Sequence, residues 1–224
     1  MMASRGLLVV MHDVVPKREA EFSPWCREEY LPAMCRVPGM LSAQLYRALD
    51  GVPKYLTLCE AAGLESFDQL EYLRLRGWAQ NGGGAAANMF EACLNLTVGI
   101  YERTLTAPDP EPEAAILNRA RGLMVRALEP SDPENDEEFQ DWYSTEHVPA
   151  LVTAPGAVRG RRYRLNSDAK DNRGVRMNYL AIYEAETPDV FSSDAWRSKA
   201  NTPWTRRIRR YYTSVLRNVY ERVI

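Results

Sequence analysis

Histidine is scarce in this chain, and its cysteines form no recognisable pairs. The 224 residues include 2 histidines and 4 cysteines, and no two cysteines form a C-x-x-C motif. The cysteines are Cys26, Cys35, Cys59 and Cys93. We interpret them as reduced thiols of a cytoplasmic protein, because their spacing suits neither a disulfide framework nor a zinc site. His12 and His147 are far apart in the sequence, and Glu146 cannot easily join its neighbour His147 on one ion, so we predict no metal site.

The chain also lacks an excess of charge of either sign and any long apolar run. Its 28 Lys and Arg residues nearly balance its 30 Asp and Glu residues, which argues against a nucleic acid or a membrane surface as partner. The apolar run at 7–11 is too short for a signal peptide or a membrane span. No G-x-S-x-G elbow supports a serine hydrolase. The glycines at 82–84 are followed by no lysine or serine, so we predict a flexible loop or lid there rather than a phosphate cradle.

Two stretches of the sequence match each other without a gap. The matched residues of the first half are Phe22, Trp25, Glu29, Pro32, Pro38, Gly39, Tyr46 and Arg47. Each recurs 117 positions later in the chain. The tripeptide Tyr-Glu-Arg also occurs near the end of both halves, at 101–103 and 220–222. This repetition indicates that one structural unit has been duplicated.

Both halves show the same order of predicted elements. In the first half we predict strands at 6–12, 40–47, 54–60 and 94–104, and helices at 17–34 and 67–78, the second capped by Ser66. In the second half we predict strands at 122–128, 158–165, 177–184 and 214–223, and helices at 137–148, 191–199 and 204–211. The β-α-β-β-α-β order is that of the ferredoxin-like unit. We therefore predict an α+β protein with ferredoxin-like halves at 1–106 and 119–224, joined by an extended Pro/acid linker at 107–118 without core residues.

The predicted helix at 137–148 has an unusual face. At helical spacing it groups three aromatic residues with a carboxylate and a histidine, namely Phe139, Trp142, Tyr143, Glu146 and His147. Pro149 has no N–H to donate and would clash with the carbonyl of Thr145, so the helix should kink or end nearby. We expect the bend to aim a ring nitrogen of His147 into a pocket.

This second-half pattern carries a family resemblance. Trp-Tyr-x-x-Glu-His-x-Pro, then Pro-Gly and a strand ending in Arg-Tyr-Arg, resembles the signature of EthD-like proteins in the dimeric α/β-barrel superfamily. The first half is degenerate, with Cys26 and Tyr30 at the positions of Tyr143 and His147. The resemblance implies that two ferredoxin-like units pair into a barrel, here within one chain. The superfamily includes cofactor-independent monooxygenases, polyketide cyclases, lactone isomerases and haem enzymes, so the resemblance implies a fold more than a reaction.

Alternation along the strands suggests which side chains line a cavity. His12 and Arg126 are polar positions in otherwise apolar strands, so we predict that their faces point into the barrel. Tyr179 and Tyr183 share one face of a hairpin strand, and Tyr220 is a matching candidate in the last strand. The predicted pocket is aromatic, apolar and sparsely polar, which suits a ring-bearing ligand.

The candidate residues have functional and structural interpretations. His147 can exchange a proton near neutral pH as a general acid or base, or it can simply cap a helix end. His12 is a second proton carrier or a residue satisfied by a backbone carbonyl. Glu146 is either catalytic or structural, and its counterpart Glu29 in the half without the histidine favours structure. Trp142 either contacts a substrate or packs in the core.

We therefore expect a cofactor-independent lyase, isomerase or cyclase that transfers protons on a small hydrophobic or aromatic compound. The expected catalytic residues are His147, His12 and Tyr143, and the expected substrate-binding residues are Arg126, Trp142, Tyr179, Tyr183 and Tyr220. One alternative is an oxygenase that is cofactor-free or uses haem, and another is a non-catalytic binder of a hydrophobic metabolite. Exposed barrel edges lead us to expect a homodimer as well.

Overall fold

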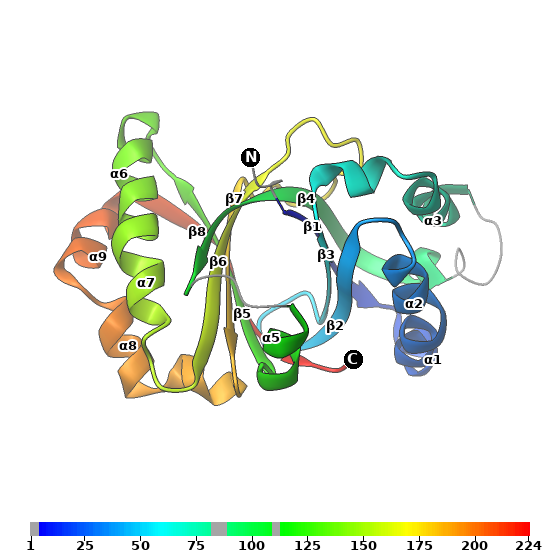
Figure 1. The fold of residues 1–224 in the computed structure, drawn as a ribbon, viewed down its shortest axis with the longest axis horizontal. Helices are drawn as coiled ribbons and strands as arrows, with labels where there is room; N and C mark the ends of the chain where they lie inside the picture. The colour runs from blue at the N-terminus through cyan, green and yellow to red at the C-terminus, as the bar shows by residue number, and fades with distance from the viewer. Residues whose placement is uncertain (1–4, 82–88, 109–112) are drawn as a thin grey trace.

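The computed structural model describes residues 5–81, 89–108 and 113–224. Within them, eight antiparallel strands close into one barrel (Figure 1). The strands are β1 (Gly6–Val14), β2 (Met40–Asp50), β3 (Tyr55–Ala61), β4 (Cys93–Ala107), β5 (Gly122–Pro130), β6 (Ala157–Leu165), β7 (Tyr179–Ala185) and β8 (Tyr212–Arg222). Their order around the barrel is β1-β3-β2-β8-β5-β7-β6-β4.

The strand order shows how the two halves share the barrel. The first half contributes the run β4-β1-β3-β2 and the second half the equivalent run β8-β5-β7-β6. The runs meet edge to edge, where β2 pairs with β8 and β4 pairs with β6. Each half thus uses the other half to satisfy the backbone groups of its edge strands. The prediction of an α+β fold, with tandem ferredoxin-like units in one intramolecular barrel, is confirmed.

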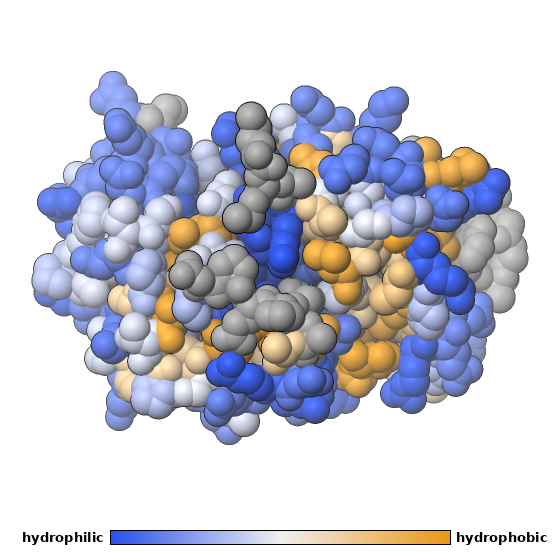
Figure 2. Space-filling view, viewed as in Figure 1, coloured by the Kyte–Doolittle hydropathy of each residue, from blue (hydrophilic) through white to orange (hydrophobic). Residues whose placement is uncertain are grey.

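Helices flank the barrel on two opposite sides (Figure 1). The first half supplies α1 (Glu19–Trp25), α2 (Leu31–Cys35) and α3 (Leu70–Asn81), and the second half supplies α6 (Asp136–Asp141), α7 (Val148–Leu151), α8 (Asp194–Ala200) and α9 (Pro203–Ile208). Figure 2 shows mainly hydrophilic residues over the outer side of both helical layers. The apolar side chains of the helices, such as Phe22 and Phe139, pack on the outer face of the barrel. Each half therefore has its own core between helices and sheet.

Both helices of the repeated motif contain a π-helical turn at the same position. Residues Cys26–Tyr30 form this turn between α1 and α2, and Trp142–His147 form it between α6 and α7. The N–H of Val148 donates to the carbonyl of Tyr143, five residues earlier, immediately before Pro149. The wider turn lets the helix continue through a proline that lacks an N–H, and such turns are frequent at functional sites. The helix consequently runs on to Leu151 instead of ending at His147.

The barrel interior is filled with side chains. One apolar cluster occupies it, with Leu7, Val9 and Met11 from β1 and Leu123, Val125 and Ala127 from β5. Successive residues alternate across a strand, so the opposite positions, which include His12 and Arg126, point outward to the helices. The prediction that this face lines an internal cavity is therefore wrong. An eight-stranded barrel is narrow enough for its own side chains to fill, and here this apolar cluster fills the space between the strands.

Charged residues occupy the same interior face beyond the apolar cluster. Glu184 accepts hydrogen bonds from Arg159 at 2.5 and 2.9 Å and forms an ion pair with Arg161 at 3.2 Å. Arg161 also pairs with Glu60, which accepts a 2.7 Å hydrogen bond from the hydroxyl of Tyr163. The four charged side chains are all buried. They couple β3 of the first half to β6 and β7 of the second half.

Two local predictions need correction. Ser66 does not cap a helix, because it lies inside the 3-10 turn Leu64–Asp68, and α3 begins only at Leu70. The predicted linker contains the helix α5 (Glu113–Arg119), whose Ile116 packs with Val158 in a small core cluster. The predicted glycine loop at 82–84 lies outside the described residues. Among the described helices, none combines the length and the apolarity needed to cross a lipid bilayer.

The buried ion pairs lead to a stability prediction. Glu184→Ala should lower the free energy of unfolding by about 3–5 kcal/mol, because two buried arginines lose their shared carboxylate. Urea unfolding at pH 7 measures this change. Glu186→Ala, an exposed carboxylate two residues further on, should stay within about 0.5 kcal/mol of the unsubstituted protein. Equal effects of the two substitutions would show that the interior pairs do not stabilise the barrel.

Candidate functional site

A cavity of about 460 Å³ lies between the second half of the sheet and its helices. Its floor is the outer face of β5, β7 and β8, and its walls are the π-helical turn Trp142–His147 together with α8 and α9. The lining residues are Met124, Arg126, Leu128, Trp142, Tyr143, His147, Leu151, Tyr183, Phe191, Trp196, Arg197, Ala200, Asn201, Thr205, Arg209, Tyr212 and Arg217. Its size is that of a pocket for a small organic ligand.

The imidazole ring of His147 lines this cavity and is held by contacts with aromatic rings. Its imidazole stacks on Trp142 with centroids 4.3 Å apart and meets the ring of Tyr143 edge-on at 5.3 Å. Trp142 is itself held by a 3.2 Å hydrogen bond from its Nε1 to the hydroxyl of Thr205. Nδ1 of His147 is buried and has no hydrogen-bond partner among the described residues. The aromatic walls therefore fix the ring while leaving its polar atoms available.

The surroundings keep His147 neutral. Burial lowers its pKa from an ordinary value of 6.5 to about 3, and the positive charges of Arg126, Arg162 and Arg209 act in the same direction. Both causes disfavour the imidazolium form. At neutral pH the ring is therefore a proton acceptor and cannot act as a proton donor in its charged form.

Two tyrosines stand close to the histidine. Burial raises the pKa of Tyr143 to about 12 and raises the pKa of Tyr183 well above its ordinary value. Each hydroxyl influences the pKa of the other, so the two lie close together, and both stay protonated at neutral pH. Behind them the guanidinium of Arg162 lies over the ring of Tyr143 at 4.2 Å and donates a 2.7 Å hydrogen bond to Gln140. The tyrosines are thus placed to donate hydrogen bonds to a ligand.

The charged residues that line the cavity are all cations. Four arginines do so, and no carboxylate appears among the described lining residues. Arg197 pairs with Asp194 and Arg217 with Asp50, in both cases at the protein surface. Arg126 donates only a weak 3.3 Å hydrogen bond to the neutral hydroxyl of Ser214. A cleft with one sign of charge attracts ligands of the opposite sign, so the cavity favours an anion.

The structure brings together five of the predicted site residues. Arg126, Trp142, Tyr143, His147 and Tyr183 all line this one cavity. They come from three elements that are far apart in the sequence, namely β5, the π-helical turn and β7. Only the tertiary structure brings these elements together.

The other three predicted site residues lie elsewhere. His12 is on the helix-facing side of the first half, where its Nδ1 bonds the carbonyl of Asp13 at 3.1 Å and burial lowers its pKa to about 4. Tyr220 is inside the barrel and receives a 2.7 Å hydrogen bond from Asn218. Tyr179 packs near Phe139 and lines a separate groove. None of the three lines the cavity of His147.

Glu146 has a structural contact. Its carboxylate accepts a 2.5 Å hydrogen bond from the hydroxyl of Thr202, which also caps the N-terminus of α9 by accepting from the N–H of Thr205. The carboxylate therefore joins the motif helix to α9. This contact favours the structural interpretation of Glu146.

Sequence reasoning missed most of the arginines. Arg206, Arg207, Arg209 and Arg210 look like one solvated face of a helix, but only Arg209 lines the cavity. Arg197 and Arg217 likewise reach the cavity from α8 and β8. The run of four arginines was a signal in the sequence, but only the tertiary structure shows that Arg209 is the one that lines the cavity.

Comparisons with known proteins connect this geometry to a fold. The chain matches no protein-family model and no curated protein sequence. It is similar in structure to an anthrone oxidase-like protein, with a TM-score of 0.65, 13% identity, and coverage of 99% of this chain and 92% of that one. A candidate monooxygenase from Fusobacterium nucleatum subsp. nucleatum gives a TM-score of 0.63 at 13% identity, covering 100% and 94%. A haem-binding protein from Thermus thermophilus gives 0.58 at 12% identity, covering 99% and 92%.

The chain has the dimeric α/β-barrel fold. Similarity at this level of identity shows the fold alone, because many unrelated reactions use the same architecture. The resemblance to EthD-like proteins is accordingly confirmed for the barrel, and its finer assignment stays a prediction.

The two buried histidines predict a pH dependence of stability. Both are protonated more easily in the unfolded chain, near pH 6.5, than in the folded one, near pH 4 for His12 and pH 3 for His147. Between pH 6.5 and 4 the unfolded state therefore binds more protons, and the free energy of unfolding falls as the pH falls. We expect each histidine to contribute up to about 1 kcal/mol per pH unit.

Urea unfolding of the protein and of His147→Gln at pH 7, 6 and 5 measures this dependence. The substitution should remove the share of His147 and leave that of His12, so the slope should become shallower. Identical slopes would mean that His147 titrates normally in the folded protein.

Proposed function

We propose that the cavity of His147 binds an acidic aromatic compound and that His147 accepts a proton from it. The observation that carries the proposal is the combination of a neutral, uncommitted imidazole with four arginines and no carboxylate among the described lining residues. The aromatic walls suit a planar ligand, and the arginines suit the negative charge that deprotonation creates. This is the cofactor-independent proton-transfer enzyme expected from the sequence, with a narrower class of substrate.

The arginines compensate for the weak basicity of His147. A histidine with a pKa of about 3 is a poor base for a substrate in water. In the cavity, the same cations that lower its pKa stabilise the conjugate anion of the substrate, which makes the substrate more acidic. Tyr143 and Tyr183, both protonated, would donate hydrogen bonds to an oxygen on which the charge develops. Return of the proton to another carbon would give an isomerase, and attack of the carbanion on a carbonyl carbon of the same molecule, with the proton returned to the resulting alkoxide, would give a cyclase.

A second candidate is a cofactor-free oxygenase built on the same first step. The anion of an electron-rich aromatic can react with dioxygen instead of being protonated again. The similarity to an anthrone oxidase-like protein and to a candidate monooxygenase supports this outcome. The proton-transfer step and its residues are common to both candidates, so the fate of the anion distinguishes them.

Haem ligation by His147 does not fit its cavity. A histidine that ligates a metal donates its other ring N–H to a carboxylate or carbonyl, which orients the ring. Nδ1 of His147 is buried and has no such acceptor among the described residues. The haem-binding neighbour therefore supports a shared fold and supplies no step for this cavity.

Proton abstraction can be measured as deuterium uptake by acidic aromatic probes. Under anaerobic conditions in D₂O, we expect the protein to accelerate exchange of the acidic C–H of anthrone or of a phenolic analogue, followed by NMR. His147→Gln should slow the exchange by roughly 10²–10⁴-fold with little change in Tm, because the base is lost and the fold is kept. Loss of folding in this variant would mean that the ring serves architecture. Exchange equal to the unsubstituted protein would exclude His147 as the base.

The anion-binding role can be tested with a matched pair of neighbouring arginines. Arg209→Gln should raise KM about tenfold, because one charge-assisted contact to the anion is lost. Arg210→Gln removes the same charge from an adjacent exposed residue outside the cavity and should leave KM unchanged. Equal effects would indicate general electrostatic attraction instead of a contact.

Admission of air separates the two candidate functions. Consumption of dioxygen in proportion to probe turnover, abolished by His147→Gln, would select the oxygenase. Exchange or isomerisation without oxygen uptake would select the proton-transfer enzyme. Saturable binding without either reaction, unaffected by His147→Gln, would identify a non-catalytic binder.

A further inference from the structure

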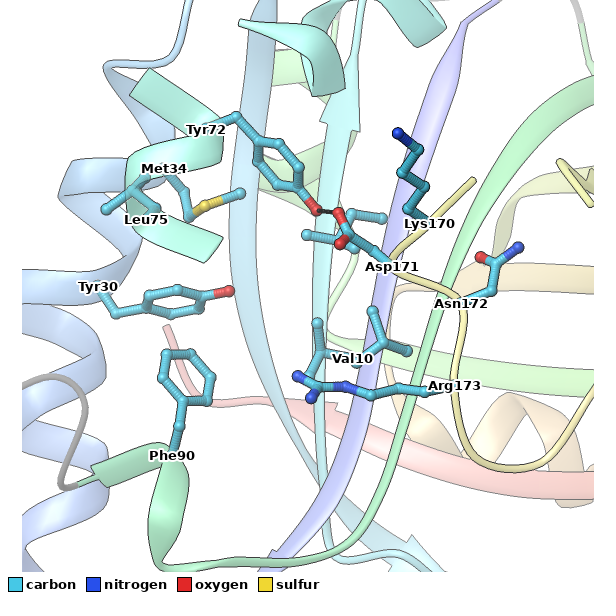
Figure 3. Close-up of a pocket in the computed structure, with 12 residues that line it drawn as sticks. Val10, Tyr30, Met34, Tyr72, Leu75, Phe90, Lys170, Asp171, Asn172 and Arg173 are labelled. Carbon is cyan, nitrogen blue, oxygen red and sulfur yellow. Dashed lines mark hydrogen bonds between the residues drawn. The ribbon is translucent and has the colours of Figure 1, made fainter. Parts of the chain in front are cut away.

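A second cavity, of about 90 Å³, lies in the first half of the chain (Figure 3). We propose that it is a separate ligand site for a small molecule with an apolar body, such as one ring, and a single carboxylate. The site does not use His147, and the proposal does not depend on the function assigned above.

The internal repeat explains why a cavity exists here. Tyr30 occupies the position of His147 in the duplicated motif, at the end of the other π-helical turn. The cavity again lies between that turn and the outer face of the first strand of its half, here Leu8 and Val10. Tyr30 is held between Trp25, on which it stacks at 5.2 Å, and Phe90, which meets it edge-on at 5.2 Å. The first half has thus replaced the imidazole with a fixed phenol.

The floor and walls of the cavity are apolar. Leu8, Val10 and Val98 come from the sheet, and Met34 and Leu75 come from α2 and α3. With the ring of Phe90 they surround a small space, which Figure 3 shows between the helices and β1. A volume of about 90 Å³ is well below the roughly 300–1,000 Å³ of pockets for drug-sized ligands. The apolar part of the ligand is therefore small.

The rim of the cavity comes from the other half of the chain. The connection between β6 and β7 spans 166–178, whereas the equivalent connection between β2 and β3 spans only 51–54. The longer connection crosses over the first half and is fixed there by backbone. Val98 and Arg173 exchange N–H···O bonds of 2.9 Å in both directions, and the N–H of Ile100 donates to the side chain of Asn172 at 3.0 Å. A rim built in this way is a fixed part of the site.

One side chain of the rim is already engaged. Asp171 is buried and accepts a 2.9 Å hydrogen bond from the hydroxyl of Tyr72, the dashed line in Figure 3. This contact fastens the rim to α3. Asp171 therefore serves the closure of the cavity.

Two donors remain to face the interior. In Figure 3 the guanidinium of Arg173 extends over Val10 towards the hydroxyl of Tyr30, which points back from the opposite wall. No carboxylate of the described residues forms an ion pair with Arg173. Burial raises the pKa of Tyr30 far above its ordinary value, so its hydroxyl stays protonated and can donate. Two donors on opposite sides of an apolar space are matched by one acceptor group with negative charge, which is a carboxylate.

Methionine methyl groups provide a reporter for each cavity. Met34 lines the first-half cavity, and Met124 lines the cavity of His147. The full-length protein, labelled with ¹³C at the methionine methyls, is titrated with benzoate and, separately, with benzyl alcohol as an uncharged ring of similar size. We expect a saturable shift of the Met34 methyl with benzoate and a much weaker response with benzyl alcohol. Any shift of Met124 reports the other cavity and is analysed separately.

A matched pair of arginines on the rim tests the role of the charge. Arg173→Gln should weaken the benzoate response of Met34 about tenfold, because the charge-assisted contact is lost. Arg176→Gln removes the same charge from an exposed residue of the same connection that does not line this cavity, and it should leave the response unchanged.

Three results would overturn the proposal. They are no Met34 shift with benzoate, an equal shift with benzyl alcohol, or equal weakening by the two substitutions. The first result would leave an apolar packing defect in place of a ligand site. The second would leave a site for neutral apolar molecules, and the third would leave only non-specific attraction of anions.

Discussion

Closure of the barrel is the constraint from which the rest of the molecule follows. Eight strands enclose a space that their own side chains fill, first with leucine, valine and tyrosine and then with the buried pairs among Glu60, Arg159, Arg161 and Glu184. A ligand cannot enter that space without displacing a packed core. The two cavities that adjoin the repeated motif accordingly lie between the outer face of the sheet and the helices, one in each half of the chain. A further cavity of about 270 Å³ is lined by Met11 and Met177 of the interior cluster. Closure also binds the halves together, because the edge strands of each half are satisfied only by the other.

A proline explains the local geometry of both cavities. Pro32 and Pro149 lack an N–H at equivalent positions, and a π-helical turn precedes each of them. In the second half this turn directs Trp142, Tyr143 and His147 to the sheet together, although an ordinary helix would spread three such neighbours over a wider arc. The imidazole is consequently held by aromatic contacts, and its nitrogens are not used to hold it. The π-helical turn and the aromatic contacts thus determine the position of the imidazole of His147. Its Nδ1 is available because it has no hydrogen-bond partner among the described residues.

The fold could be predicted from the sequence because its evidence is local and occurs twice. The repeated motif and the order of the predicted strands led to two ferredoxin-like units, and the resemblance to the dimeric α/β-barrel superfamily implied that they pair into a barrel. The direction of the strand faces could not be predicted in this way, since a polar residue such as Arg126 is compatible with either side of a sheet until the barrel is known to be full. The arginines of the cavity could not be predicted either, because nothing in the sequence distinguishes Arg209, which lines the cavity, from Arg210, which does not. The buried ion pair between Arg161 and Glu60 joins residues that are 101 positions apart, and no local sequence pattern predicts such a contact.

The two halves differ in the repeated motif and also in the length of the connection between their second and third strands. The connection at 166–178 covers the cavity of the first half, while its short counterpart at 51–54 does not reach the cavity of the second half. The covered cavity is small, about 90 Å³. The cavity without this cover is larger, about 460 Å³, and is lined by the imidazole of His147. The half with tyrosine at the position of the histidine is therefore also the half whose cavity is covered by the connection at 166–178. The proposed proton transfer accordingly uses the larger cavity, which this connection does not cover.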